Sequence, residues 1–101
     1  MIKIINKRKY DTDTAEELLT YSNGYSTSNF QHYTETLYRK RTGEFFLYGE
    51  GGPTSRYAER LENLLMSGSK IVPLTDDEAR EWVADHFDGE DYIEIFGDVE
   101  E

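Results

Sequence analysis

The sequence predicts an α+β fold, in which a small, mostly antiparallel sheet of three or four strands is covered by two or three short helices. Three observations favour this class. Residues 33–48 have the residue types of a β-hairpin, residues 55–66 carry apolar side chains at helical spacing, and a helix-capping motif stands immediately before residues 76–87. Both helices are expected to cover the sheet built around the hairpin.

The hairpin is predicted by its composition and by its turn. Residues 33–39 are rich in the β-branched and aromatic side chains that suit a pleated surface. Thr42 and Gly43 then indicate a turn. The segment from Glu44 to Tyr48 is therefore interpreted as the return strand.

Two further strands are expected to lie at edges. The segment from Met1 to Ile5 is β-branched and alternates weakly before Asn6, which is typical of a strand that enters a turn or a tight hairpin. Residues 70–74 have the pattern of a short strand. Since Pro73 lacks a backbone donor, this strand suits an edge or terminal position.

Two helices are predicted over residues 14–22 and 55–66. For the first, Thr14 is a capping residue and the side chains of Leu18 and Leu19 share one helical face. The second follows the break at Gly49 to Pro53. Its apolar residues fall at i, i+1, i+4, i+7 and i+8, namely Tyr57, Ala58, Leu61, Leu64 and Leu65.

The helix over 76–87 begins after Thr75, which is expected to form a capping box with Glu78. Gly89 is expected to stop this helix. Residues 92–96 are interpreted as one more helical turn, although their pattern also alternates. The buried face of the main helix is expected to hold Ala79, Trp82, Val83, His86 and Phe87.

Length and composition indicate a single domain over residues 1–101, with a frayed acidic C-terminus at 97–101. Hydrophobic content of 37% is low and charged content of 32% is high, but an aromatic share of 14% argues against disorder. The absence of cysteine excludes thiol chemistry and favours a reducing compartment. No apolar stretch approaches the about 18 residues of a membrane span or forms a signal-peptide region, so a cytoplasmic location is expected.

The negative charge lies almost entirely in the last quarter of the chain. Residues 75–101 hold twelve Asp or Glu and one cation, Arg80, for a charge of −11. Residues 1–74 hold the other nine acids and ten bases, for +1, which together give the net charge of −10. A field this one-sided repels nucleic acid and attracts basic protein surfaces, including those that normally hold DNA or RNA.

Three segments carry a resemblance to known proteins: Lys9 to Ala15, Glu35 to Lys40 with Gly43 to Gly52, and Lys70 to Thr75 with the acidic Trp-containing helix that follows. They resemble a family of short proteins, mostly without assigned function, carried on mobile elements of Firmicutes such as plasmids, conjugative elements and phages. The shared motifs are structural, so the resemblance implies a genomic setting rather than an activity. In size, charge and setting only, the chain is also similar to anti-CRISPR inhibitors, many of which occupy nucleic-acid channels of RNA-guided nucleases.

Seven carboxylates on or beside the outer face of the last main helix are the candidate partner-binding residues. Two interpretations stay open for them. They form either a solvated face that keeps a small protein in solution, or a ridge that imitates a phosphate backbone, since helical residues i and i+4 lie about 6 Å apart. The seven are Asp77, Glu81, Asp85, Asp88, Glu90, Asp91 and Glu94.

Two basic triplets near predicted turns form an alternative, nucleic-acid-binding site. Each neighbours a tyrosine, which suits phosphate contact and base stacking. If the triplets meet in space, they would bind RNA or the acidic helix of another copy; solvated hairpin tips that discourage edge pairing are the other interpretation. The triplets are Lys7, Arg8, Lys9 and Arg39, Lys40, Arg41.

No motif indicates catalysis, a cofactor or a dedicated metal site. His32 is interpreted as a surface strand residue and His86 as a partly buried ring, without a nucleophile motif. The carboxylates at 88–91 lack the spacing of a calcium loop, and residues 49–55 lack the lysine of a phosphate-binding loop. A small hydrolase or nuclease would need one of the histidines beside several carboxylates in a cleft.

The sequence therefore predicts a non-enzymatic accessory protein of a mobile element that binds and blocks a basic nucleic-acid-binding surface of a host defence protein. Its most concrete form is an anti-CRISPR inhibitor of an RNA-guided nuclease. The acidic ridge would steer the encounter, and Tyr25, Tyr38 or Tyr48 would supply contact area. The alternative is an RNA- or DNA-binding accessory factor that uses the basic hairpin tips. No membrane partner is expected, and the chain is expected to be a monomer or homodimer.

Overall fold

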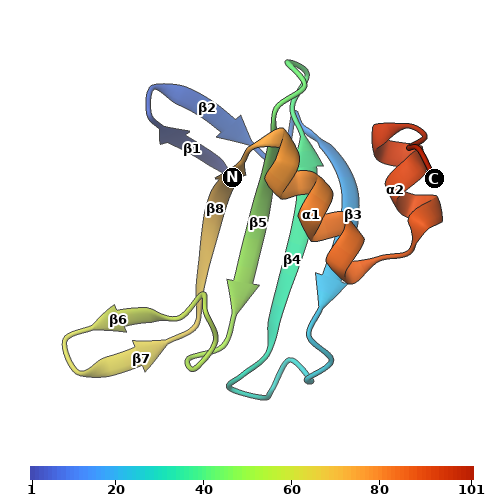
Figure 1. Cartoon of the computed structure of the whole chain (residues 1–101). Helices are drawn as coiled ribbons and strands as arrows, with labels where there is room; N and C mark the ends of the chain where they lie inside the picture. The colour runs from blue at the N-terminus through green and yellow to red at the C-terminus, as the bar shows by residue number, and fades with distance from the viewer.

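The computed structural model describes residues 1–101 and is built on a four-stranded antiparallel sheet (Figure 1). In spatial order its strands are β3 (Glu16–Ser22), β4 (Tyr33–Arg39), β5 (Phe45–Gly51) and β8 (Gly68–Leu74). The chain continues from β8 into two helices. The predicted α+β class, with helices packed on a small antiparallel sheet, is confirmed.

The two helices are α1 (Asp76–His86) and α2 (Gly89–Phe96). Figure 1 shows α1 crossing one face of the sheet, whereas α2 lies beyond the β3 edge. Neither helix has the length and apolar character needed to cross a membrane.

Two small hairpins extend this central sheet. The first pairs β1 (Ile2–Ile5) with β2 (Arg8–Asp11), and the second pairs β6 (Glu59–Leu61) with β7 (Leu64–Met66). In Figure 1 both lie on the β8 side of the molecule, near opposite ends of that strand, and the β6–β7 hairpin extends away from the sheet.

Side chains alternate between the two faces of the sheet, as the period of a strand requires. On one face, Leu37, Phe45 and Leu47 are buried against α1, which contributes Trp82 and Val83. The opposite face has a second apolar cluster, to which the β1–β2 hairpin contributes one ring. Its buried members are Tyr10, Tyr38, Phe46 and Ile71.

The predicted hairpin over 33–48 is confirmed as the β4–β5 pair, in which Leu37 lies opposite Leu47. Gly43 in its turn has a φ of +92°, a left-handed conformation that glycine adopts at no steric cost. The strand expected over 70–74 is β8, an edge strand of the sheet, which accommodates the missing donor of Pro73.

The helix predicted over residues 14–22 is wrong, because residues 16–22 form β3 and pair with β4. The register of this pairing shifts between Glu17 and Leu19, so the alternation is interrupted at the bulge. The bulge gives Leu18 and Leu19 adjacent apolar positions that resemble a helical face. Pairing with β4 outweighs the local capping signal at Thr14.

The helix predicted over residues 55–66 is also wrong. Tyr57 is buried in the core, but the later leucines belong to the β6–β7 hairpin and are exposed. The turn of this hairpin includes Glu62, whose φ is +56°. The apolar residues match a helical period in sequence, but they do not share one buried surface.

The helix expected over 76–87 is α1, and its capping box is confirmed: the Glu78 amide donates to the Thr75 hydroxyl at 3.1 Å and the Thr75 amide donates to the Glu78 carboxylate at 2.8 Å. The predicted stop at Gly89 is wrong. Helix α1 ends at His86, and Gly89 is the first residue of α2, whose N-cap is Asp88. The helical interpretation of residues 92–96 is confirmed.

Candidate functional site

A buried carboxylate holds α1 on the sheet. Glu35 of β4 is 2% exposed and accepts a hydrogen bond from the indole Nε1 of Trp82 at 2.9 Å and another from the hydroxyl of Tyr57. The guanidinium of Arg56 lies 3.5 Å from the same carboxylate. Every buried side-chain polar atom thus has a partner, which is the condition for a stable buried charge.

Tyr57 enters this network because Gly49 makes room for it. A Cβ atom on Gly49 would overlap the Tyr57 ring. Burial and the hydrogen bond to Glu35 both raise the pKa of Tyr57, so its hydroxyl remains a donor at neutral pH. The network therefore joins β4, α1 and the segment before β6 into one rigid scaffold. Its inward-facing acid was detectable from sequence, since Glu35 shares a strand face with Tyr33 and Leu37, but its partners were not.

The predicted acidic residues all lie on α1, on α2 or in the cap of α2, and we call these seven the acidic face. Three of them, Asp77, Glu81 and Asp85, follow one stripe of α1 at intervals of four residues. The other four belong to α2 and its cap, and two of these, Asp91 and Glu94, line a hollow that α2 forms with β3. The four are Asp88, Glu90, Asp91 and Glu94, all exposed except the half-buried Asp91.

None of the seven carboxylates of the acidic face forms an ion pair within 4.0 Å, which is evident from the complete set of salt bridges. Arg80, the one cation within the two helices, donates to Asp76 at 2.6 Å and to the hydroxyl of Tyr92 at 3.3 Å. Arg80 also packs over the ring of Phe96. The acidic face therefore keeps its full negative charge.

Repulsion within the acidic face is evident at Asp91. Partial desolvation and the neighbouring carboxylates of Asp88, Glu94 and Glu90 raise the pKa of Asp91. A raised carboxyl pKa means that the surroundings of Asp91 disfavour its negatively charged form. A cationic group placed here would relieve this repulsion.

An apolar hollow of about 530 Å³ adjoins the acidic face, between the end of α1 and α2. Asp88 lies on its rim. Its apolar lining is formed by Ala84, Phe87, Tyr92, Ile93 and Val99.

The structure brings most of the two basic triplets to one end of the sheet, and we call this region the basic junction. Arg8 of β2 and Lys40 of the β4–β5 turn contact the same carboxylate, Glu44, at 3.0 and 3.4 Å. Lys40 also lies 4.0 Å above the centre of the Tyr10 ring. A shallow hollow of about 240 Å³ at this junction is lined by Lys9, Lys40 and Arg41, among others.

Two features limit the charge of the basic junction. Arg39 is not part of it, because its side chain contacts Glu16 at 3.0 Å and the carbonyl of Ile95 at 3.3 Å. Glu44 lies among its cations. Desolvation alone would raise the pKa of Glu44, but Lys40 and Arg8 more than offset it, so the pKa of Glu44 is lowered.

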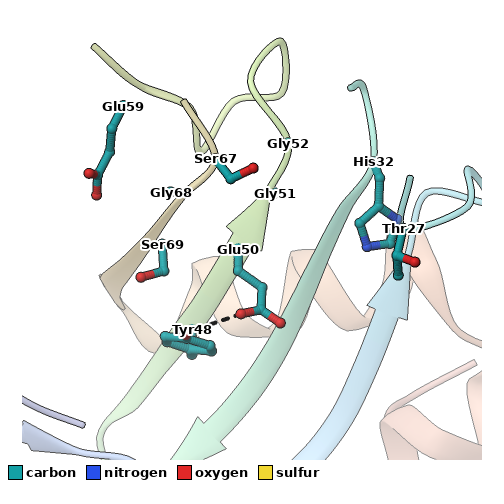
Figure 2. Close-up of a pocket in the computed structure, with 10 residues that line it drawn as sticks. All are labelled: Thr27, His32, Tyr48, Glu50, Gly51, Gly52, Glu59, Ser67, Gly68 and Ser69. Carbon is teal, nitrogen blue, oxygen red and sulfur yellow. Dashed lines mark hydrogen bonds between the residues drawn. The ribbon is translucent and has the colours of Figure 1, made fainter. Parts of the chain in front are cut away.

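The two histidines occupy separate places. His86 is half-buried between the rings of Trp82 and Tyr21, and its Nδ1 lies 2.8 Å from the Trp82 carbonyl oxygen. His32 precedes β4 and lines an open polar hollow of about 500 Å³ together with Glu50 and Glu59. In that hollow the three side chains stand apart (Figure 2). The carboxylate of Glu50 accepts instead from Tyr48 at 3.3 Å, and the ring of His32 contacts the Tyr25 carbonyl.

No group of three His, Cys, Asp or Glu side chains lies close enough together to hold a metal ion. Of the three tyrosines expected to supply contact area, Tyr25 is exposed and Tyr48 is half-buried, but Tyr38 is buried and stacks on Phe46. No protein family, curated protein or solved structure matches this chain.

Proposed function

We propose that this chain is a non-enzymatic binding protein whose acidic face occupies a basic, nucleic-acid-binding surface of a partner protein. The most concrete partner is an RNA-guided nuclease of a bacterial host that carries the protein on a mobile element, with the encounter in the cytoplasm. The observation that carries this proposal is the set of seven carboxylates on two adjacent helices, none of them in an ion pair.

The helices present these charges on a rigid support. The Thr75–Glu78 capping box fixes the start of α1, and the Trp82–Glu35 hydrogen bond fixes its middle. Along α1 the carboxylates recur about every 6 Å, the spacing of helical i and i+4 neighbours. Because little ordering remains to be done on binding, the entropic cost of association is reduced.

The electrostatic consequences follow from the missing internal cations. A basic groove that normally holds nucleic acid offers the lysines and arginines that the acidic face lacks. Long-range attraction would raise the association rate, and salt would screen it. Nucleic acid and this protein would then compete for the same groove.

The test is a titration of purified RNA-guided nucleases, each free of guide RNA, with this protein. Binding is measured between about 50 and 500 mM salt, a range in which the Debye length shortens severalfold. The proposal expects affinity that falls steeply with salt and is lost when guide RNA is bound first. Binding that is indifferent to both would contradict it.

A pair of matched variants separates position from net charge. Glu81→Lys, Asp85→Lys and Asp91→Lys together reverse the acidic face, whereas Glu50→Lys, Glu59→Lys and Glu62→Lys change the net charge equally at sites outside it. Only the first triple variant is expected to abolish binding. Equal loss in both would mean that overall charge, and not the acidic face, is recognised.

A second candidate function is direct binding of RNA or DNA through the basic junction, and one observation favours it: the turns that carry the two triplets meet in space. Lys9→Glu with Arg41→Glu should then remove binding to a single-stranded RNA oligonucleotide. Arg39→Glu serves as the control, since that side chain is directed toward Glu16 and α2. Equal loss of binding in the control would count against the junction as the site.

A further inference from the structure

The β6–β7 hairpin has an exposed apolar face that nothing in the chain covers. Leu61 lies opposite Leu64, and Glu59 lies opposite Met66, so these four side chains share one face. Leu61 and Leu64 are 64% and 61% exposed. An isolated two-stranded hairpin is at best marginally stable in water, so this face gains most from a partner.

The β1–β2 hairpin has a similar uncovered face. Tyr10 packs against the sheet, so the alternate residues Ile2 and Ile4 face away from it, with exposures of 60% and 62%. Lys9 lies directly opposite Ile4 on this outer face. Each hairpin therefore presents an apolar pair beside one exposed charge. The second charge of the β1–β2 face, Asp11 opposite Ile2, is buried and lies 4.0 Å from the ammonium of Lys9, whose side chain stays exposed.

The charges on the two faces are opposite in sign. The β6–β7 face carries Glu59 beside its leucines, and the β1–β2 face carries Lys9 beside its isoleucines. Flat apolar surfaces with complementary charges suit each other, and the charges fix their register. These two faces cannot reach each other within one chain without distortion, because they lie near opposite ends of β8, about 20 Å apart at a rise of 3.3 Å per residue (Figure 1).

We propose that the partner of these faces is a second copy of this chain. A two-fold axis near the middle of β8 would place the β6–β7 hairpin of each protomer on the β1–β2 hairpin of its partner. The same contact then forms twice, as a closed symmetric dimer requires. Pro73, which lacks a donor, limits direct pairing of the two β8 edges, so the hairpins carry the interface.

The extended shape of the monomer agrees with this arrangement. Its radius of gyration is 14.8 Å, compared with about 13 Å for a compact chain of 100 residues. The longest dimension is 49 Å, to which the projecting β6–β7 hairpin contributes (Figure 1). In the dimer this hairpin would pack on the β1–β2 hairpin of the second copy instead of projecting into solvent.

The first experiment measures the dimer dissociation constant by analytical ultracentrifugation over a wide concentration range. Leu61→Ser with Leu64→Ser should raise that constant about 10,000-fold, because the contact forms twice in the dimer and each of the four leucines that loses its burial costs about a factor of ten. Leu65→Ser is the matched control, because Leu65 lies on the opposite face of the hairpin and should leave the constant within a few fold. Circular dichroism checks that each variant is folded.

The second experiment identifies the surface that the hairpin meets. The chain contains no cysteine, so Glu59→Cys and Lys9→Cys each introduce a single thiol. Mixing the two variants under mild oxidation should give a cross-linked heterodimer. A wild-type protein that stays monomeric at all concentrations, a dimer unaffected by the leucine changes, or Glu59→Cys chains that link only to each other would overturn the proposal.

Discussion

The acidic face and the basic junction differ in how much of their charge is available to a partner. All seven carboxylates of the acidic face lack an ion pair, whereas four of the six predicted basic residues have one. Those four are Arg8, Lys9, Arg39 and Lys40. Two charged clusters that sequence alone presents as equally available therefore differ in their ion pairs: the acidic face has none, whereas the basic junction is largely neutralised by neighbouring carboxylates.

The largest expected effect comes from removing the main contact between the sheet and α1, the helix that carries the first part of the acidic face. Trp82→Ala removes a buried ring and the donor to Glu35, and should lower the free energy of unfolding by about 4 kcal/mol. The measurement is urea denaturation followed by tyrosine fluorescence. Trp82→Phe keeps most of the ring and should cost less; equal losses would mean that burial of this side chain contributes little.

Overpacking the same scaffold should have the next largest effect. Gly49→Ala places a methyl group where the Tyr57 ring lies, and should lower the free energy of unfolding by about 2 kcal/mol. Thermal melting provides the measurement. Gly89→Ala is the control, because a Cβ there meets no other atom within 4 Å. A small cost at Gly49 would show that Tyr57 moves easily and that the Glu35 network is loose.

The basic junction should respond to the loss of its central carboxylate. Glu44→Gln removes the partner of Arg8 and Lys40 and should cost about 0.5 kcal/mol at neutral pH, the value of an exposed pair. The pKa of Glu44 is lowered, so its stabilisation is present above its unfolded pKa and is lost as pH falls below it. The stabilities of the two proteins should therefore converge in acid, once the pH is below the lowered pKa of Glu44. A difference that persists there would exclude the charge as its cause.

The acidic face should show the opposite sign and the smallest effect. The pKa of Asp91 is raised in the folded state, so its contribution is favourable at low pH and is lost as pH rises through that pKa. Asp91→Asn should therefore raise the melting temperature slightly at pH 7 but not at pH 3. Added salt should reduce the gain, since it screens the repulsion from Asp88 and Glu94. A loss of stability at pH 7 would contradict this account of the face.

The sequence was informative where structure is local. The turn at Gly43 and the capping box at Thr75 depend on residues within a few positions of each other, and both were predicted correctly. The exposure of the acidic stripe followed from the helical period of α1. Each of these features is determined by neighbouring residues alone.

The sequence was misleading where distant segments decide the outcome. Residues 16–22 become a strand because β4 is there to pair with them, and Tyr57 is buried because Gly49 and Glu35 lie beneath it. The neutralised cations of the basic junction have the same explanation, since Arg39 reaches Glu16 across the sheet. The secondary-structure propensity of a segment does not depend on such distant partners, so it could not predict these contacts.

The separation of the two charged regions makes the whole molecule an electric dipole. The basic junction lies near the β1–β2 hairpin, whereas the acidic face extends from the start of α1, beside the β4–β5 turn, to α2 on the other side of the molecule (Figure 1). In the field of a cationic surface, such a molecule experiences a torque that turns its helices toward that surface before contact. A larger fraction of encounters would then begin with the helices facing the partner, so the association rate constant would rise.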